Sequence, residues 1–383
     1  MSGWLWNYSV GWIWPKPEFL SVFADQDVER GKNVKLICDA NTGNVTATWA
    51  KDGCQLRVKG KHISTARNST FSLEIKNVEQ KDVGKYSLTL TNITGSVSHS
   101  ANITLALKEW RNIPKEPNEM IKSLKNLKIC TDEVTELRLL LHGPVGAGKS
   151  SIINTIKSIF ENRPFVNAPA ATGSSTSYTL NYKKYSVGRF AIYDVKGLER
   201  TSGGVNPDDI INALKGHIKN GYKFGDDPIN TDDEFYNISP GLNDKIHCLI
   251  SVIPASNPSG RGPDGKEAFI DEDMVKKLKN IRENASKLEI PQVVFMTKVD
   301  KACPTTKEDL SKIYTSKKIK EKMEVCSNLL NVPMNCIFPV QNYHEENKLD
   351  PVLNSLMLDA LNQVVHWAND YLKSVYESQK HVE

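Results

Sequence analysis

The chain has 383 residues, of which 39% are hydrophobic and 25% charged, and its formal net charge is +4 at pH 7. This length predicts two or three domains, and the composition is that of an ordinary water-soluble globular protein. Because the lysines are scattered and form no stripe, the charge gives no reason to expect nucleic acid as a partner.

Residues 1–16 form a tryptophan-rich arm, MSGWLWNYSVGWIWPK. The arm lacks the basic start and unbroken apolar stretch of a signal peptide, and no apolar run in the chain reaches the ~20 residues that span a bilayer. We expect its tryptophans to pack on a domain. The alternative is an anchor on a membrane surface or a partner, since indole rings favour such boundaries.

The cysteines are odd in number, widely spaced and without a CxxC pair; they are Cys38, Cys54, Cys130, Cys248, Cys303, Cys326 and Cys336. This pattern argues against a disulfide framework and against a zinc site. Reduced thiols in a cytoplasmic protein are the simplest interpretation.

Residues 17–107 predict an all-β sandwich. Short alternating runs such as NVKLICDA, FSLEIKNV and KYSLTLTN are separated by glycine and Asn/Asp clusters at the spacing of sandwich strands. Residues 108–124 carry two prolines and mixed charge, which is typical of a linker.

Residues 125–383 predict an α/β domain. Apolar runs such as LRLLLHG, KIHCLISVI and QVVFMTKVD alternate with segments of helical periodicity, as in a mostly parallel sheet with helices on both faces. The tail after residue 350 repeats apolar residues at helical spacing and predicts a helix with one buried face.

The stretch LLHGPVGAGKSSI fits the P-loop spacing, with a strand before it and a helix after it. Backbone N–H groups and the helix N-terminus would hold a phosphate chain. Lys149 would bridge the β- and γ-phosphates, and Ser150 would bind Mg²⁺. The predicted nucleotide contacts of this stretch are Gly143, Val145, Gly146, Ala147, Gly148, Lys149, Ser150 and Ser151.

Two later motifs favour GTP over ATP. Asp194 and Gly197 form a D-x-x-G motif, in which the carboxylate would hold Mg²⁺ and the glycine amide would sense the γ-phosphate. Thr297, Lys298 and Asp300 lie in TKVD, where a carboxylate can accept both N–H donors of guanine, a pair that adenine lacks.

Weaker candidates complete the predicted site. Gln341 and Asn342 follow a strand where a second base-contacting loop belongs. Thr176, with Thr172 second, is the candidate switch threonine for Mg²⁺ and the γ-phosphate. Leu198 stands where Ras-like proteins have a water-orienting glutamine, so binding is better supported than hydrolysis. Lys149, Thr176 and Gly197 are the candidate catalytic groups.

The blocks LLHGPVGAGKSSIINTIKSIF, LKGHI, DKIHC, VVFMTKVDKAC and PVQNYHEE resemble the interferon-induced protein 44 family over residues ~125–380. The resemblance implies a cytoplasmic, interferon-inducible, GTPase-like protein of innate antiviral defence. His217 and His247 fall in these blocks, and we expect them to be hydrogen-bonded in the core rather than catalytic.

The front third departs from family members that begin with a TLDc-type domain and resembles an immunoglobulin I-set domain instead. Cys38 and Trp49 occupy the B- and C-strand positions, and Tyr86 fits the tyrosine corner. Leu88 replaces the second cysteine, so the resemblance implies a domain without its disulfide. Its edges and loops would bind a protein partner.

Two functions follow as alternatives. The first is a GTP-binding switch, with slow GTP hydrolysis left open, in which a GTP-dependent homodimer could supply the missing catalytic group. The loop arginines for that role are Arg163, Arg189, Arg200 and Arg261. The second is a scaffold that hydrolyses no nucleotide or binds none.

Overall fold

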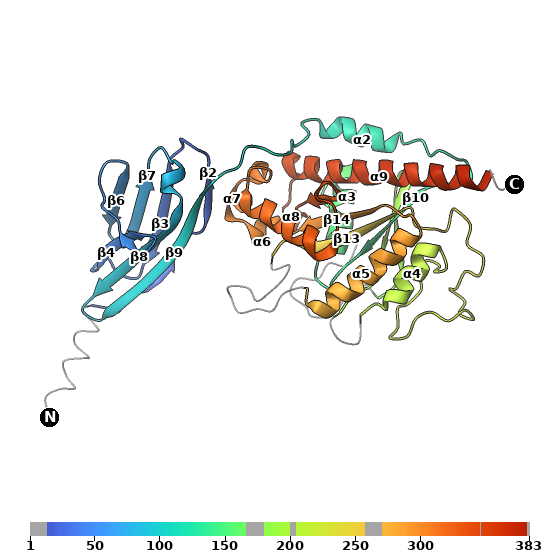
Figure 1. Ribbon diagram of the computed structural model, residues 1–383, viewed down its shortest axis with the longest axis horizontal. Helices are drawn as coiled ribbons and strands as arrows, with labels where there is room; N and C mark the ends of the chain where they lie inside the picture. The colour runs from blue at the N-terminus through green and yellow to red at the C-terminus, as the bar shows by residue number, and fades with distance from the viewer. Residues whose placement is uncertain (1–13, 166–179, 200–203, 257–269, 345, 381–383) are drawn as a thin grey trace, which may run out of the picture. The chain divides into compact units, whose positions relative to one another are not determined.

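The computed structural model describes residues 14–165, 180–199, 204–256, 270–344 and 346–380. Contacts divide the chain into two compact units. Unit 1 comprises Met1–Arg111 and Cys303–Lys317, and unit 2 comprises Asn112–Ala302 and Lys318–Glu383. Figure 1 labels most of the helices and strands of both units.

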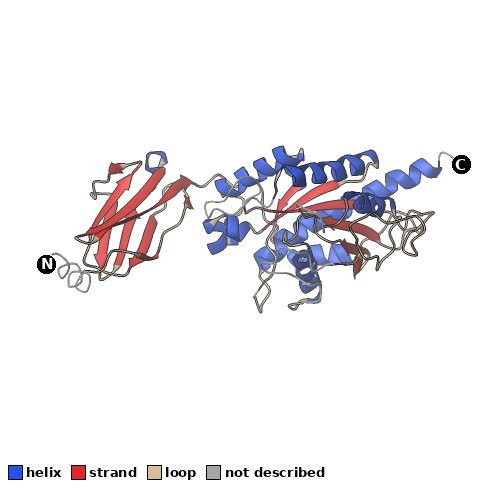
Figure 2. Cartoon of the chain, turned by 90° about the horizontal axis from the view of Figure 1, so that it is seen from below, coloured by secondary structure: helices blue, strands red, loops and turns tan. Residues whose placement is uncertain are grey.

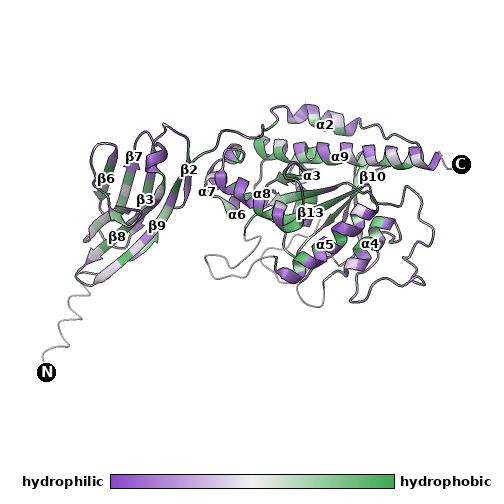
Figure 3. Cartoon of the chain, viewed as in Figure 1, coloured by the Kyte–Doolittle hydropathy of each residue, from purple (hydrophilic) through white to green (hydrophobic). Residues whose placement is uncertain are grey.

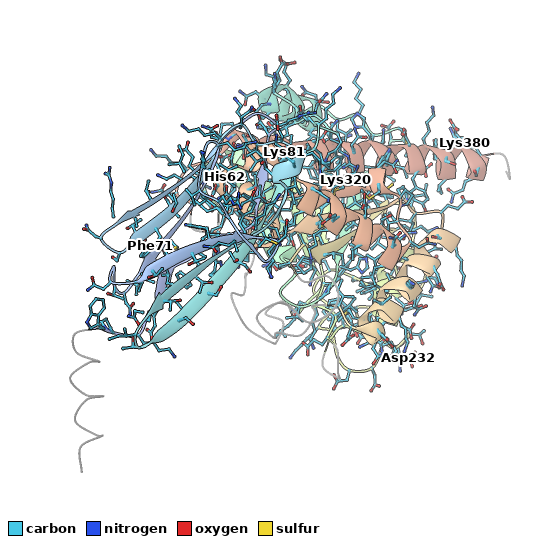
Figure 4. All side chains as sticks on the ribbon, turned by 60° about the vertical axis from the view of Figure 1, so that its left-hand side comes forward. His62, Phe71, Lys81, Asp232, Lys320 and Lys380 are labelled. Atoms are coloured by element: carbon cyan, nitrogen blue, oxygen red, sulfur yellow. The ribbon has the colours of Figure 1, made fainter. Side chains whose placement is uncertain are left out.

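Unit 1 is built on a β-sandwich, as the sequence predicts. One sheet has the order β1-β3-β7-β6 and the other the order β2-β9-β8-β4-β5. The strands are β1 (Phe19–Ser21), β2 (Gln26–Val28), β3 (Val34–Ala40), β4 (Thr46–Lys51), β5 (Cys54–Gln55), β6 (His62–Arg67), β7 (Thr70–Ile75), β8 (Gly84–Asn92) and β9 (Gly95–Leu105). A short 3-10 helix, η1 (Gln80–Asp82), carries Lys81, which Figure 4 labels.

The sandwich core holds together without a disulfide. Cys38 is a free, buried thiol whose pKa burial raises to about 11, and it packs in one cluster with Trp49, Phe71 and Leu88. Leu88 lies opposite Trp49 in the β4–β8 ladder. The Tyr86 hydroxyl donates to the Asp82 carbonyl at 2.8 Å, which closes the predicted tyrosine corner.

Unit 2 is an α/β unit around a sheet of order β11-β12-β10-β13-β14-β15. All its pairings are parallel except that of β11 with β12. The strands are β10 (Leu137–His142), β11 (Lys183–Val187), β12 (Phe190–Asp194), β13 (Cys248–Pro254), β14 (Gln292–Thr297) and β15 (Ile337–Pro339). The α/β prediction is confirmed.

Helices cover both faces of this sheet, as Figures 1 and 2 show. They are α2 (Pro117–Lys125), α3 (Lys149–Glu161), α4 (Pro207–Lys215), α5 (Glu272–Lys287), α6 (Val299–Ala302), α8 (Lys317–Leu330) and α9 (Pro351–Lys380), with the 3-10 turn η3 (Met334–Cys336). Alternate residues of β13, Cys248, Ile250 and Val252, pack in one core cluster with the buried side of α9. The intervening residues are buried as well, the polar Ser251 among them, so every position of β13 is buried, and the labelled strand is mostly green in Figure 3.

One segment differs from the sequence prediction, and several of the predicted residues lie outside the described ranges. Helix α2 covers the second half of the predicted linker and ends one residue beyond it, and its Leu124 is buried against the core of unit 2. Thr172, Thr176, Thr179, Arg200, Arg261 and most of the tryptophan-rich arm lie outside the described residues.

Candidate functional site

A glycine-rich loop, residues 143–150, follows the end of β10 and includes the first two residues of α3. Two of its glycines are required by the backbone geometry. A Cβ on Gly143 would lie 2.3 Å from the Val252 carbonyl oxygen, and Gly148 has φ +103°. A Cβ on Gly148 would also come within 3.0 Å of Asn342 Nδ2. The loop is therefore held close to β13 and to the segment after β15, with the N-terminal turn of α3 beginning at Lys149.

Lys149 is buried within this loop, with 7% of its surface exposed. Its Nζ donates to the carbonyl oxygens of Gly143 and Pro144, both at 3.1 Å. Burial lowers its pKa to about 8, while the carboxylate of Asp194 opposes that shift. A cation in this position, among neutral carbonyls at a helix N-terminus, would gain from a phosphate oxygen.

Ser150 and Asp194 come together from different elements. The Ser150 Oγ donates to Asp194 Oδ2 at 2.8 Å, and Asp194 ends β12 in a buried position. No cluster of three or more His, Cys, Asp or Glu suited to a metal occurs among the described residues. A hydroxyl and one carboxylate nevertheless fit Mg²⁺, which takes few protein ligands and fills its remaining positions with phosphate and water oxygens.

The D-x-x-G segment is bonded to the glycine-rich loop through its main chain, a feature that no sequence signal indicates. Leu198 N donates to Gly143 O, and Val145 N donates to Leu198 O, both at 3.0 Å. A Cβ on Gly197 would lie 2.5 Å from a methyl carbon of Val145, so only glycine fits there. Leu198 itself is 1% exposed, so its side chain is buried.

The Thr297–Asp300 turn begins at the last residue of β14 and approaches the same loop. Thr297 Oγ1 donates to Ala147 O at 2.6 Å, and Asn342 Nδ2 donates to Gly148 O at 3.3 Å. Lys298 adopts φ +56°, and burial lowers its pKa. Thr297 and Asn342 thus bring two of the predicted base-contacting segments to the loop predicted to hold phosphate. Gln341 and Asp300 are partly buried.

The histidines singled out from the sequence have structural partners. His247 Nδ1 accepts from Arg138 N at 2.9 Å, so Nε2 carries the proton toward Leu242 O, and burial lowers the pKa to about 4. His217 bonds Asn237 O at 2.8 Å through Nδ1 and stacks on Tyr236.

A third histidine was missed by sequence reasoning. His142 immediately precedes the glycine-rich loop and is fully buried, with Nε2 2.7 Å from Ser251 Oγ. Burial lowers its pKa to about 3. The apolar run LRLLLHG predicted a buried strand here, but such a run gives no signal for a specific hydroxyl partner on β13.

Comparisons with known proteins agree with both units. An immunoglobulin I-set domain model matches residues 17–105. Interferon-induced protein 44 of Homo sapiens is 26% identical over 386 residues, covering 95% of this chain and 84% of that protein. Interferon-induced protein 44 of Mus musculus is 30% identical over 278 residues, covering 70% of this chain but only 63% of the mouse protein. Titin domain M7 is 32% identical over 24% of this chain and 93% of that domain, with a TM-score of 0.23.

Within the described ranges, none of the helices combines the length and the apolar character that crossing a bilayer requires.

The sequence matches extend through nearly the whole chain, and the I-set match coincides with the strands of the sandwich. The chain therefore belongs to the interferon-induced protein 44 family and carries an immunoglobulin I-set domain in its front third.

Proposed function

We propose that this chain binds GTP together with Mg²⁺ at the glycine-rich loop. The observation that carries the proposal is the convergence of three separate segments on that loop. Ser150 bonds Asp194, Thr297 bonds Ala147, and Asn342 bonds Gly148. A turn rich in glycine for purely structural reasons would not require polar contacts from β12, β14 and the segment after β15 at once.

Each group has a role that its chemistry supports. The loop amides and the start of α3 would hold the phosphates, and Lys149 would neutralise them. Ser150 and Asp194 would hold Mg²⁺, which supplies charge neutralisation on the phosphate oxygens when bound. Asp300 would accept the two guanine N–H donors, which gives selectivity over adenine.

Turnover has less support than binding. Leu198 offers no group that could orient water, and its main chain is bonded to Gly143 and Val145. A non-hydrolysing scaffold is therefore the second candidate function. A GTP-dependent homodimer would be one route to a catalytic group from outside the chain.

The setting of the protein is also a proposal. The names of the relatives support induction by interferon, and with it a role in antiviral defence. The seven cysteines, all among the described residues, form no disulfide, which supports a reducing compartment such as the cytoplasm. The I-set domain would bind a protein partner.

Titration of fluorescent GTP and ATP against the wild type, Lys149→Ala and Asp300→Ala tests the binding site. We expect GTP to bind in preference to ATP, and each substitution to weaken GTP binding about 10- to 100-fold, because each removes hydrogen bonds to a charged group. Asp300→Ala should also reduce the preference for GTP. Phosphate release in the same samples separates a GTPase from a binding protein.

Lys276→Ala and Asp273→Ala are the matched controls. These two residues bond each other at 3.0 Å on the exposed side of α5, with side chains 74% and 71% exposed. Their removal changes the same charges without touching the loop. Equal affinity for GTP in Lys149→Ala and Lys276→Ala would contradict the proposed site, and no binding by the wild type would favour the scaffold.

A further inference from the structure

The segment Cys303–Lys317 connects two helices of unit 2 in the sequence but belongs to unit 1 by its contacts. It begins three residues after Asp300 and holds α7 (Pro304–Glu308) and the 3-10 turn η2 (Leu310–Lys312). The chain thus passes directly from the proposed guanine-binding turn into the compact unit that contains the immunoglobulin-like sandwich.

A polar network fixes this segment to strand β2. Ser316 Oγ donates to Asp27 Oδ2 at 2.8 Å, and Asp27 N donates to Thr305 Oγ1 at 3.2 Å. The other carboxylate oxygen of Asp27 accepts from Thr104 Oγ1 on β9. Ser316 is fully buried, and its Oγ lies 3.2 Å from the buried Sγ of Cys303. A buried hydroxyl such as that of Ser316 needs its partners, so the network favours one position for the segment.

A second set of contacts joins the segment to the residues that follow β9. Leu107 N donates to Thr315 O at 2.8 Å, and Trp110 N donates to Tyr314 O at 3.2 Å. The rings of Trp110 and Tyr314 meet edge to face, with centroids 5.1 Å apart. The segment is therefore held by two sets of contacts, one with β2 and one with residues 107–110.

At its N-terminal end the segment directly follows a tightly hydrogen-bonded turn. Thr297 Oγ1 is bonded to the glycine-rich loop at Ala147 O. Lys298 O accepts from Lys301 N at 3.1 Å and from Ala302 N at 3.2 Å, which closes the single-turn helix α6. Because Cys303 follows at once, a shift of the Thr297–Asp300 turn must be absorbed by a tight turn or passed on to Cys303–Lys317.

We propose that Cys303–Lys317 couples nucleotide binding at the Thr297–Asp300 turn to the immunoglobulin-like unit, so that a partner on that unit regulates nucleotide affinity. The inference rests on the proposed function. Coupling of this kind is reciprocal: whatever stabilises the Asp27 network favours nucleotide binding, and nucleotide favours the network. The sandwich is then a regulatory module and not only a recruitment module.

The test compares two carboxylates of the same sandwich in the full chain. Asp27→Ala removes the network, whereas Asp39→Ala removes a carboxylate that accepts from Thr70 and Ser21, at 2.6 and 2.8 Å, inside the sandwich. We expect Asp27→Ala to weaken fluorescent GTP binding about three- to tenfold and Asp39→Ala to leave it unchanged. Ser316→Ala, a milder change, should follow Asp27→Ala in direction even if the larger change disturbs folding.

Amide hydrogen exchange supplies a readout that does not depend on the variants. GTP with Mg²⁺ should slow exchange in 303–317 and at the amides of Asp27, Leu107 and Trp110, which bond that segment. The coupling would be overturned, and the proposed function kept, if the wild type and all variants bound GTP with equal affinity and exchange slowed only in unit 2. Absence of GTP binding by the wild type would instead overturn the proposed function, and the coupling with it.

Discussion

Lys149 shows at the residue scale how a binding site can cost stability. Burial lowers its pKa from 10.5 to about 8. The unfolded chain therefore holds this proton more tightly than the folded chain does. The cost to folding is full below pH 8 and fades as the pH rises from 8 toward 10.5. A lysine kept in such a place is explained by what it binds rather than by what it stabilises.

The variant Lys149→Met tests this account. It keeps the length of the side chain without its charge, so we expect the nucleotide-free variant to be more stable than wild type at pH 7 by roughly 1–3 kcal/mol. Urea unfolding at pH 7 and pH 10 measures the difference, which should shrink at the higher pH. A variant less stable than wild type at pH 7 would mean that the ammonium's bonds to Gly143 and Pro144 outweigh its desolvation.

At the element scale, the connection of β10 to α3 depends on Gly148 as the N-cap of α3. We expect Gly148→Ala to weaken GTP binding at least about tenfold, because it strains a residue at φ +103° and presses on the Asn342 amide. Gly188→Ala in the β11–β12 turn is the control: φ is +60° there, but a Cβ would meet nothing within 4 Å. Both should lose about 1 kcal/mol of stability; equal GTP affinities would show that the cap geometry does not shape the site.

The elements also show what could be predicted from sequence. Alternation and turn spacing predicted the sandwich, and unbroken apolar runs predicted the parallel sheet, because each pattern reports burial along one strand. Loop spacing and order brought Lys149, Ser150, Asp194 and Thr297 to attention. Contacts between distant segments leave no such pattern. The amino-acid sequence does not indicate that Leu198 bonds Gly143 or that Cys303–Lys317 contacts the sandwich. Both contacts depend on where main-chain groups meet in space.

At the scale of the whole molecule, each unit carries buried thiols that can report its opening. Cys38 lies in the core of unit 1 and Cys248 in the core of unit 2, and burial raises the pKa of both. Cys54 and Cys130 are exposed. In the native protein a maleimide should therefore label Cys54 and Cys130 first, because a thiol reacts as its accessible thiolate.

Labelling along a urea series, read by mass spectrometry of peptides, then follows the two units separately. Since the units have separate cores, we expect Cys38 and Cys248 to become reactive at different urea concentrations. GTP with Mg²⁺ should raise the midpoint for Cys248 more than that for Cys38, because the proposed ligand contacts lie in unit 2. One shared midpoint with and without nucleotide would mean that the units unfold as a single cooperative body. The two midpoints could instead be separate, with that of Cys38 still rising when nucleotide is added. This outcome would indicate coupling through Cys303–Lys317, because only a ligand whose binding is linked to the sandwich can protect the core of the sandwich.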